Sequence, residues 1–148
     1  MQNFSGFFIN EKITYAPPLS MFKLTLKENW NGKLFTHCFN ELVLYTPEYS
    51  IGAVGDVFLN ETHMGMVKVV QSRSLPFSRI SDTVSYLNIG MPVQYQAQHL
   101  NVLYNNGNPL PADTVLLHIV LAYVKRNVEN QSVLINQYWN NELIKAKA

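Results

Sequence analysis

Charged residues are scarce in this sequence, at 14% of its 148 positions against the roughly 25% of typical soluble domains. Lysine and arginine number 11 and aspartate and glutamate 10, which gives a formal net charge of +1. This balance excludes proteins that hold duplex nucleic acid by bulk electrostatics, because such domains are usually markedly basic. Polarity comes instead from amides, since the sequence holds 16 asparagines and 7 glutamines.

Cysteine is almost absent as well. Cys38 is the only one, so neither an internal disulfide nor a zinc site with paired cysteines can form. Residues 1–10 lack the basic start and the long apolar core of a secretory signal. The longest apolar run, 114–124, is about half as long as a membrane-spanning helix. We therefore predict a cytoplasmic protein with no membrane span.

Signatures of common enzymes are also missing. The sequence has no glycine-rich phosphate-binding or dinucleotide-binding motif, no H-E-x-x-H and no G-x-S-x-G. His37 and Cys38 are adjacent, so in a strand their side chains would point to opposite faces. We predict no cofactor, no metal site and no catalytic residue. Cys38 is predicted to be a buried core residue, His37 to face a cleft, and His118 to be a satisfied core histidine.

The sequence is 47% hydrophobic, and its length and composition predict a single α+β domain. Turns are predicted at 29–32 and 62–65. Residues 1–20 are predicted to be an N-terminal extension, in which residues 7–15 could add an edge strand to the sheet. Apolar runs, alternating or continuous, predict strands at 21–27, 41–46, 57–59, 66–72 and 114–124. The last of these should be the core strand of the sheet, buried on both faces.

Capping residues and apolar periodicity predict three helices. Ser81 or Asp82 begins a short helix that stops near Gly90. Pro92 suits the first turn of a second helix, which ends at 105–107. Helical spacing of apolar residues predicts a third helix within 127–148, for which a strand at 132–135 is the alternative.

Several short motifs follow one another in an order that resembles the ASCH domain of the PUA-like superfamily. They are V-G-D-V-F at 54–58, G-M-V-K-V-V-Q-S-R at 65–73, I-S-D at 80–82, Gly90, and the segment 95–104. The resemblance covers residues 21–126. It implies a small mixed or antiparallel β-barrel with two short helices packed beside it and a cleft between them.

The same resemblance implies a function. The superfamily is associated with RNA binding and, in one bacterial branch, with deacetylation of a modified cytidine nucleoside. The family's cleft motif, a G-x-K followed by Arg, corresponds to residues 36–45. This sequence has no Gly, Lys or Arg in that stretch. The motif lysine is the proposed catalytic base of the deacetylating branch, so the departure disfavours that chemistry.

Basic and aromatic residues supply the candidate site. Lys68, Arg73 and Arg79 gather around the end of one predicted strand and the loop that follows it. Arginine beside aromatic side chains is typical of single-stranded nucleic-acid sites. Trp30 either stacks on a base or plugs the barrel. The candidate nucleic-acid-binding residues are Lys68, Arg73, Arg79, Tyr45, Trp30, Lys33 and His37.

Three functions remain open on these grounds. The sequence favours a non-enzymatic module that binds RNA or a nucleotide-like ligand in a cleft between barrel and helices. The first alternative is a modified-nucleoside amidohydrolase of the same fold, which would need a basic cleft residue such as Lys23 or Lys33. The second is a homo-oligomeric structural or assembly protein, which low charge, abundant asparagine and many aromatic residues would suit.

Overall fold

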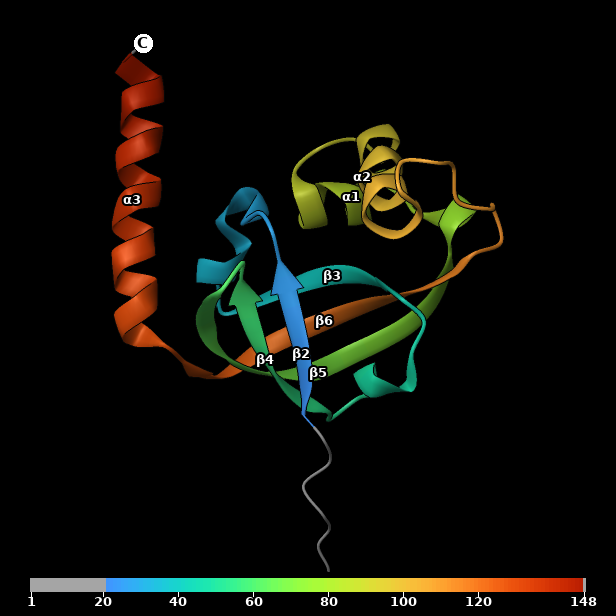
Figure 1. Ribbon diagram of the computed structural model, residues 1–148, viewed down its shortest axis with the longest axis horizontal. Helices are drawn as coiled ribbons and strands as arrows, with labels where there is room; N and C mark the ends of the chain where they lie inside the picture. The colour runs from blue at the N-terminus through green and yellow to red at the C-terminus, as the bar shows by residue number, and fades with distance from the viewer. Residues whose placement is uncertain (1–20, 148) are drawn as a thin grey trace, which may run out of the picture.

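Five strands form one mixed sheet that curls into a half-barrel (Figure 1). The computed structural model describes residues 21–147, and the strand order is β2-β4-β5-β6-β3. The parallel pair is β2 with β4, and the other pairs are antiparallel. The predicted edge strand at 7–15 lies outside the described residues. The strands are β2 (Phe22–Leu26), β3 (Cys38–Leu44), β4 (Val54–Leu59), β5 (Thr62–Pro76) and β6 (Val115–Arg126).

Residues 21–147 form a half-barrel and not the closed barrel that the resemblance implies. Within this range β2 and β3 are the two edges of the sheet, and no pairing joins them. Side chains occupy the free edge of β3 instead. Lys33 Nζ donates to the carbonyl oxygen of Asn40 at 2.8 Å, and the Tyr104 hydroxyl donates to that of Leu42 at 3.4 Å. These bonds satisfy carbonyl groups that a neighbouring strand would otherwise use.

The hairpin between β4 and β5 turns earlier than predicted. The chain reverses at Asn60 and Glu61, and Asn60 takes the left-handed conformation with φ 55°. Asparagine tolerates this conformation well, so the tight turn needs no glycine. The predicted turn at 62–65 is therefore wrong, and His63 lies within β5. Irregular registers between Val69 and Gln71 let this long strand bend around the core.

Two helices cover the face of the sheet opposite the concave core, beside β3 and β6 (Figure 1). Helix α1 (Asp82–Ile89) begins after Ser81, whose hydroxyl oxygen accepts a hydrogen bond from the Val84 amide, and ends at Gly90 with φ 74°. Helix α2 (Val93–Asn105) ends at the left-handed Asn106. Both helix predictions are confirmed, because the capping residues act as their sequence positions suggest.

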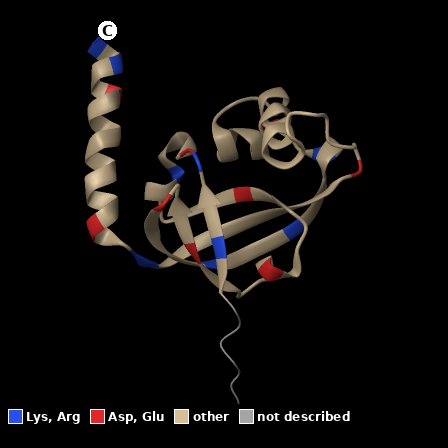
Figure 2. Cartoon of the chain, in the orientation of Figure 1, with Lys and Arg blue, Asp and Glu red and all other residues tan. Residues whose placement is uncertain are grey.

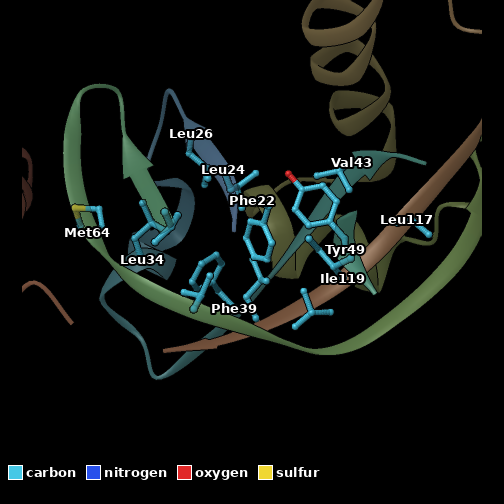
Figure 3. Packing of buried hydrophobic residues seen from close by; sticks show 14 residues of the cluster. Phe22, Leu24, Leu26, Leu34, Phe39, Val43, Tyr49, Met64, Leu117 and Ile119 are labelled. Carbon is cyan, nitrogen blue, oxygen red and sulfur yellow. The ribbon is translucent and has the colours of Figure 1, made fainter. Parts of the chain in front are cut away.

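The concave face of the half-barrel holds the main core (Figure 3). The alternating residues of β2 place Phe22, Leu24 and Leu26 inward, as the period-two pattern predicts. Tyr49, on the short helix η2 (Pro47–Tyr49), packs against Phe22 with ring centroids 4.9 Å apart. β6 lies between β5 and β3 and contributes Leu117, Ile119 and Leu121 to this core.

The third predicted helix is also confirmed. Helix α3 (Val128–Lys147) follows β6 directly, so the alternative strand at 132–135 is wrong. Asn127 caps it, because its Oδ1 accepts a hydrogen bond from the Asn130 amide at 3.1 Å. Leu134 packs against the core, and the rest of the helix rises beside the sheet (Figure 1). No helix in residues 21–147 has both the length and the apolar character needed to cross a bilayer.

Candidate functional site

A buried lysine lies at the open edge of the half-barrel. It belongs to the 3-10 segment η1 (Trp30–Phe35), in which Asn31 and Gly32 both take left-handed backbone angles near φ 60°. This reversal directs Lys33 towards β3 and α1 and leaves it only 4% exposed. A lysine is rarely buried to this degree unless its charge is paired, so its contacts define the site.

The Lys33 ammonium group has three acceptors, one for each of its hydrogens. Nζ donates to the Asn40 carbonyl oxygen at 2.8 Å, to the Asn88 side-chain oxygen, and to Glu41 Oε1 at 3.4 Å. Burial lowers the pKa of Lys33, and the neighbouring Glu41 carboxylate opposes that shift. A neutral amine has only two hydrogens to donate, so this arrangement fits the charged form.

A chain of amides continues from Lys33 into the helices. Asn88, on α1, donates through Nδ2 to Gln96 Oε1 on α2 at 2.9 Å. Both side chains are fully buried, so the chain links η1, α1 and α2 through polar contacts inside the protein. Gln96 Nε2 has no hydrogen-bond partner among the described residues. This polar chain fixes the helices relative to the sheet edge.

Glu41 presents one oxygen to the lysine and leaves the other available. Oε1 accepts from Lys33 and from the Leu42 amide, the latter at 3.2 Å. No described residue hydrogen-bonds to Oε2. The Glu41 side chain is 15% exposed, and it lines a cavity at the open edge of the sheet. Glu41 therefore lines this cavity with a carboxylate that is held through Oε1, while Oε2 has no partner among the described residues.

That cavity, which we call the α2 cavity, has a volume of about 420 Å³. It lies between the end of β2, η1, Glu41 and α2, and its size suits a small organic ligand. It is lined by Thr25, Leu26, Lys27, Glu28, Trp30, Glu41, His99, Val102 and Leu103. A carboxylate, an indole and an imidazole therefore share one cavity with aliphatic walls.

Trp30 and His99 form the aromatic side of the α2 cavity. Their ring centroids lie 5.6 Å apart with the planes 77° from parallel, an edge-to-face arrangement. Burial lowers the pKa of His99, and the Lys33 charge acts in the same direction, whereas Glu41 and Glu28 oppose it. The imidazole is therefore neutral at pH 7 and offers one donor and one acceptor.

A second cavity, of about 370 Å³, lies on the other side of the Lys33 side chain, between β3, β6 and α1; we call it the α1 cavity. It is lined by Asn31, Lys33, Thr36, Cys38, Phe39, Asn40, Tyr86, Leu87 and Val120. Cys38 is exposed there, which corrects the prediction of a buried core residue. The reason is its position at the first residue of an edge strand, on the face opposite the main core.

His118 borders this region and is only partly buried. Its Nε2 lies 3.1 Å from Asn40 Nδ2 and must accept the hydrogen bond, because an amide nitrogen only donates. Burial lowers the pKa of His118, and the charges of Arg73 and Lys33 act in the same direction. His118 thus has the hydrogen-bond partner that the sequence predicts, at the boundary of the core.

The predicted site residues fall into separate groups. Trp30 and Lys33 are brought together at the edge of the sheet, and each lines one of the two cavities. Lys68 and Arg73 are exposed along β5, and Arg79 is exposed on the short helix η3 (Phe77–Arg79). Tyr45 and His37 are exposed at the two ends of β3. None of these five residues lines the α1 or the α2 cavity.

Sequence reasoning missed four members of the site, namely Glu41, Asn88, Gln96 and His99. Glu41 stands in an apolar stretch that reads as a plain strand, and the other three lie on helices without a recognisable spacing. Their association depends on a contact between elements far apart in the sequence, the bond from Lys33 to Asn88, whose residues are 55 positions apart. The available signal was a lone carboxylate inside an apolar strand, which requires a partner when buried.

A separate histidine–aspartate contact lies on the outer face of the sheet. His63 Nε2 is 2.9 Å from Asp56 Oδ1, and Asn127 Nδ2 lies 3.2 Å from His63 Nδ1. Both ring nitrogens are therefore occupied, which leaves neither free to take a proton from a substrate. We infer that this pair holds the start of α3 against the sheet. Within residues 21–147, no three metal-ligating side chains gather at one place.

Comparisons with known proteins give little further information. No family model matches the sequence, and no curated protein matches it. The structure is similar to the crystal structure of an Enterococcus faecalis V583 protein described by the family model DUF984, with a TM-score of 0.47 and 10% sequence identity. The similarity covers 64% of this chain and 65% of that chain, which is less than two thirds of either.

Proposed function

We propose that this protein binds a nucleobase in the α2 cavity of a half-barrel of the ASCH and PUA-like type. The base belongs either to a free nucleoside or nucleotide or to single-stranded RNA. One observation carries the proposal: the Glu41 carboxylate is held in place through Oε1 by Lys33 and the Leu42 amide, beside the Trp30 indole.

The chemistry of the cavity fits a flat heterocycle with a hydrogen-bond donor. Glu41 Oε2 is an acceptor for an amino or imino N–H, and it is already oriented before the ligand enters. Trp30 and His99 offer aromatic surface to the ring, and stacking of a base on an aromatic side chain contributes about 1–3 kcal/mol. Leu26, Val102 and Leu103 would cover its edges.

The charges around the cavity favour binding through the base more than through phosphate. Lys27 is the cavity's exposed cation, while Glu28 and Glu41 are both anionic. Lys68, Arg73 and Arg79 are exposed on the surface outside the α2 cavity. In this proposal they contact the backbone of an RNA strand whose base enters the cavity, so they matter for RNA and not for a free nucleoside.

The test is a binding titration with the four ribonucleosides by calorimetry and with short single-stranded RNA by fluorescence polarisation, at two salt concentrations. Glu41→Gln keeps the shape of the side chain but removes its charge, and Trp30→Leu removes the stacking surface. We expect both variants to weaken binding at least tenfold, which corresponds to about 1.4 kcal/mol. Tyr86→Leu, which removes an aromatic residue from the α1 cavity, is the matched control.

A second pair of variants separates the two ligand classes. Arg73→Ala with Arg79→Ala should weaken RNA binding and its salt dependence while leaving nucleoside binding unchanged. Failure of every nucleoside and of RNA to bind at low salt would exclude the proposal. Equal loss of binding in Tyr86→Leu and Trp30→Leu would place the ligand elsewhere.

The amidohydrolase remains the second candidate, because Lys33 supplies the basic residue that it requires. Burial lowers the pKa of Lys33, as a lysine general base would need, and Glu41 lies beside it. Against this role, all three ammonium hydrogens have acceptors in the structure. Lys23 is a poorer candidate, because its Nζ lies over the Phe58 ring, 4.7 Å from the centroid, on the outer face of β2.

Hydrolysis of acetylated cytidine, followed by chromatography, distinguishes this candidate from simple binding. Activity that disappears in Lys33→Met and persists in Lys23→Met would favour the hydrolase. Binding of cytidine without turnover of its acetylated form would favour the module. Circular dichroism of both variants confirms that a loss of turnover reflects chemistry and not unfolding.

A further inference from the structure

Helix α3 extends beyond the part of the protein that supports it. Within the described chain, the hydrogen bonds and aromatic contacts that join α3 to other elements end at Tyr138, which meets Phe35 edge to face at 5.7 Å. The remaining residues, 139–147, make more than two helical turns. An isolated helical end of this length is marginal in water, so it needs a further surface to pack on.

The unsupported part of α3 is rich in exposed apolar side chains. Trp139 and Leu143 are each 57% exposed, and Ile144 is 66% exposed. Trp139 and Leu143 continue a line that begins with Val128 and Ile135. These four residues follow one another at spacings of seven, four and four, so they form a stripe along one side of the helix, next to its packed face. A continuous stripe of this kind, with a tryptophan at its centre, is typical of a helix–helix contact.

The charges at the two ends of α3 indicate the partner and its direction. Glu129 lies in the first turn, and Lys145 and Lys147 lie in the last. Lys145 is paired with Glu142 at 3.1 Å, so Lys147 is the cation that remains for a partner (acidic and basic residues of α3 in Figure 2). A second copy of the same helix running antiparallel brings the acidic end of each helix to the basic end of the other. A parallel copy would place like charges together. Antiparallel helix dipoles also attract.

A two-fold axis at Trp139 satisfies both patterns. It places Ile135 opposite the partner subunit's Leu143, because each lies four residues from Trp139. Glu129 lies ten residues before the axis and Lys147 eight residues after it. The offset of two residues is about 3 Å along the helix, which a lysine side chain can span. Glu129 and Lys147 also lie on the same flank of the apolar stripe, where antiparallel helices meet.

We propose that α3 forms an antiparallel homodimer through the stripe Val128, Ile135, Trp139 and Leu143, with Glu129 paired to the partner subunit's Lys147. This interface is separate from the α2 cavity and does not depend on the proposed function. Its apolar centre and charged ends correspond to the usual anatomy of a subunit contact.

The test is the mass of the full chain in solution, measured by sedimentation velocity over a wide range of protein concentration. We expect a dimer that dissociates on dilution. Leu143→Glu should weaken dimerisation by more than about tenfold, because it places a charge in the apolar stripe. Val133→Glu is the matched control, since Val133 is equally exposed but lies on a different side of α3. It should leave the mass unchanged.

A charge exchange tests the direction of the helices. Glu129→Lys alone and Lys147→Glu alone should each weaken the dimer, and the two together should restore it. In a Trp30→Phe background, the remaining Trp139 should show a blue-shifted emission as the dimer forms. A monomer at all concentrations, a dimer unaffected by Leu143→Glu, or no rescue by the double exchange would each overturn the proposal.

Discussion

Lys33 has two roles at the scale of single residues, since it neutralises Glu41 and satisfies a backbone carbonyl at the edge of β3. Both roles depend on the ammonium group and not on the aliphatic stem. A substitution that removes only the charge should therefore lower the free energy of unfolding, because the hydrogen-bond partners of Lys33 lose their donor.

We predict that Lys33→Met lowers the free energy of unfolding by about 3 kcal/mol, measured by urea denaturation. Methionine keeps most of the volume, so the loss reflects the unpaired Glu41 carboxylate and the unpaired Asn88 oxygen. Lys23→Met, at an exposed position over Phe58, should change the stability by less than about 1 kcal/mol. Equal effects of the two substitutions would contradict the assigned role of Lys33.

His118 provides a pH-dependent prediction. Its pKa is lowered in the folded state, and the unfolded value is near 6.5. As the pH falls below 6.5, the folded state therefore binds fewer protons than the unfolded state, so the contribution of His118 to stability is present above pH 6.5 and is lost as the pH falls towards the folded pKa. An NMR titration should find a folded pKa below 6.5 that rises in Arg73→Gln and stays constant in Arg79→Gln. A folded pKa above 6.5 would refute this account.

The residue scale is also where sequence reasoning found only part of the site. Trp30 and Lys33 were predicted because aromatic and basic residues are visible in any sequence. Glu41 and His99 were missed, because their importance comes from contacts with η1 and α2 that no local pattern encodes. The prediction of a buried Cys38 failed for a related reason, since apolar neighbours do not reveal that a strand lies at the edge of the sheet.

At the scale of elements, the junction between α1 and η1 depends on Gly90. This residue ends α1 in the left-handed conformation, and an added Cβ would lie 2.2 Å from Asn31 Oδ1. Asn31 in turn donates to the Tyr86 carbonyl oxygen at 2.9 Å. The contacts of Asn31 therefore hold η1, the segment that contains Lys33, against the end of α1.

Two glycine substitutions separate backbone strain from this close approach. Gly107 has a similar left-handed angle but no atom within 4 Å of an added Cβ. We predict that Gly107→Ala costs about 1 kcal/mol, from strain alone. Gly90→Ala should cost at least about 1 kcal/mol more, because the Asn31 side chain must move and its hydrogen bond to the Tyr86 carbonyl oxygen is lost. Thermal unfolding of both variants gives the comparison, and equal costs would show that Asn31 yields freely.

Helices were predicted better than strands in this chain. Ser81, Gly90 and Pro92 mark helix ends through local chemistry, which a sequence displays directly. The limits of β5 were missed, because its 15 residues contain register shifts that depend on pairing with β6. Strand ends and bulges are decided by neighbours distant in sequence, and the open half-barrel follows from the same kind of long-range information.

At the scale of the whole molecule, the proposed function would couple ligand binding to folding. A ligand in the α2 cavity contacts η1, β3 and α2 together, so it should stabilise the folded state as a unit. We predict that a nucleoside at 100 times its dissociation constant adds about 2.7 kcal/mol and raises the melting temperature. At the same nucleoside concentration the stabilisation should fall to about 1.4 kcal/mol or less in Trp30→Leu, for a tenfold or greater loss of affinity, and persist in Tyr86→Leu, with differential scanning fluorimetry as the measurement.

The side chains along β3 have a last consequence, for the behaviour of the protein at high concentration. A bare strand edge is a template on which other chains add strands and begin to aggregate. Here Lys33 and Tyr104 already occupy the edge carbonyls of β3, and β2 is only five residues long and carries an exposed lysine. The residue that holds the Glu41 carboxylate in place should thus also hinder another chain from adding a strand at this edge.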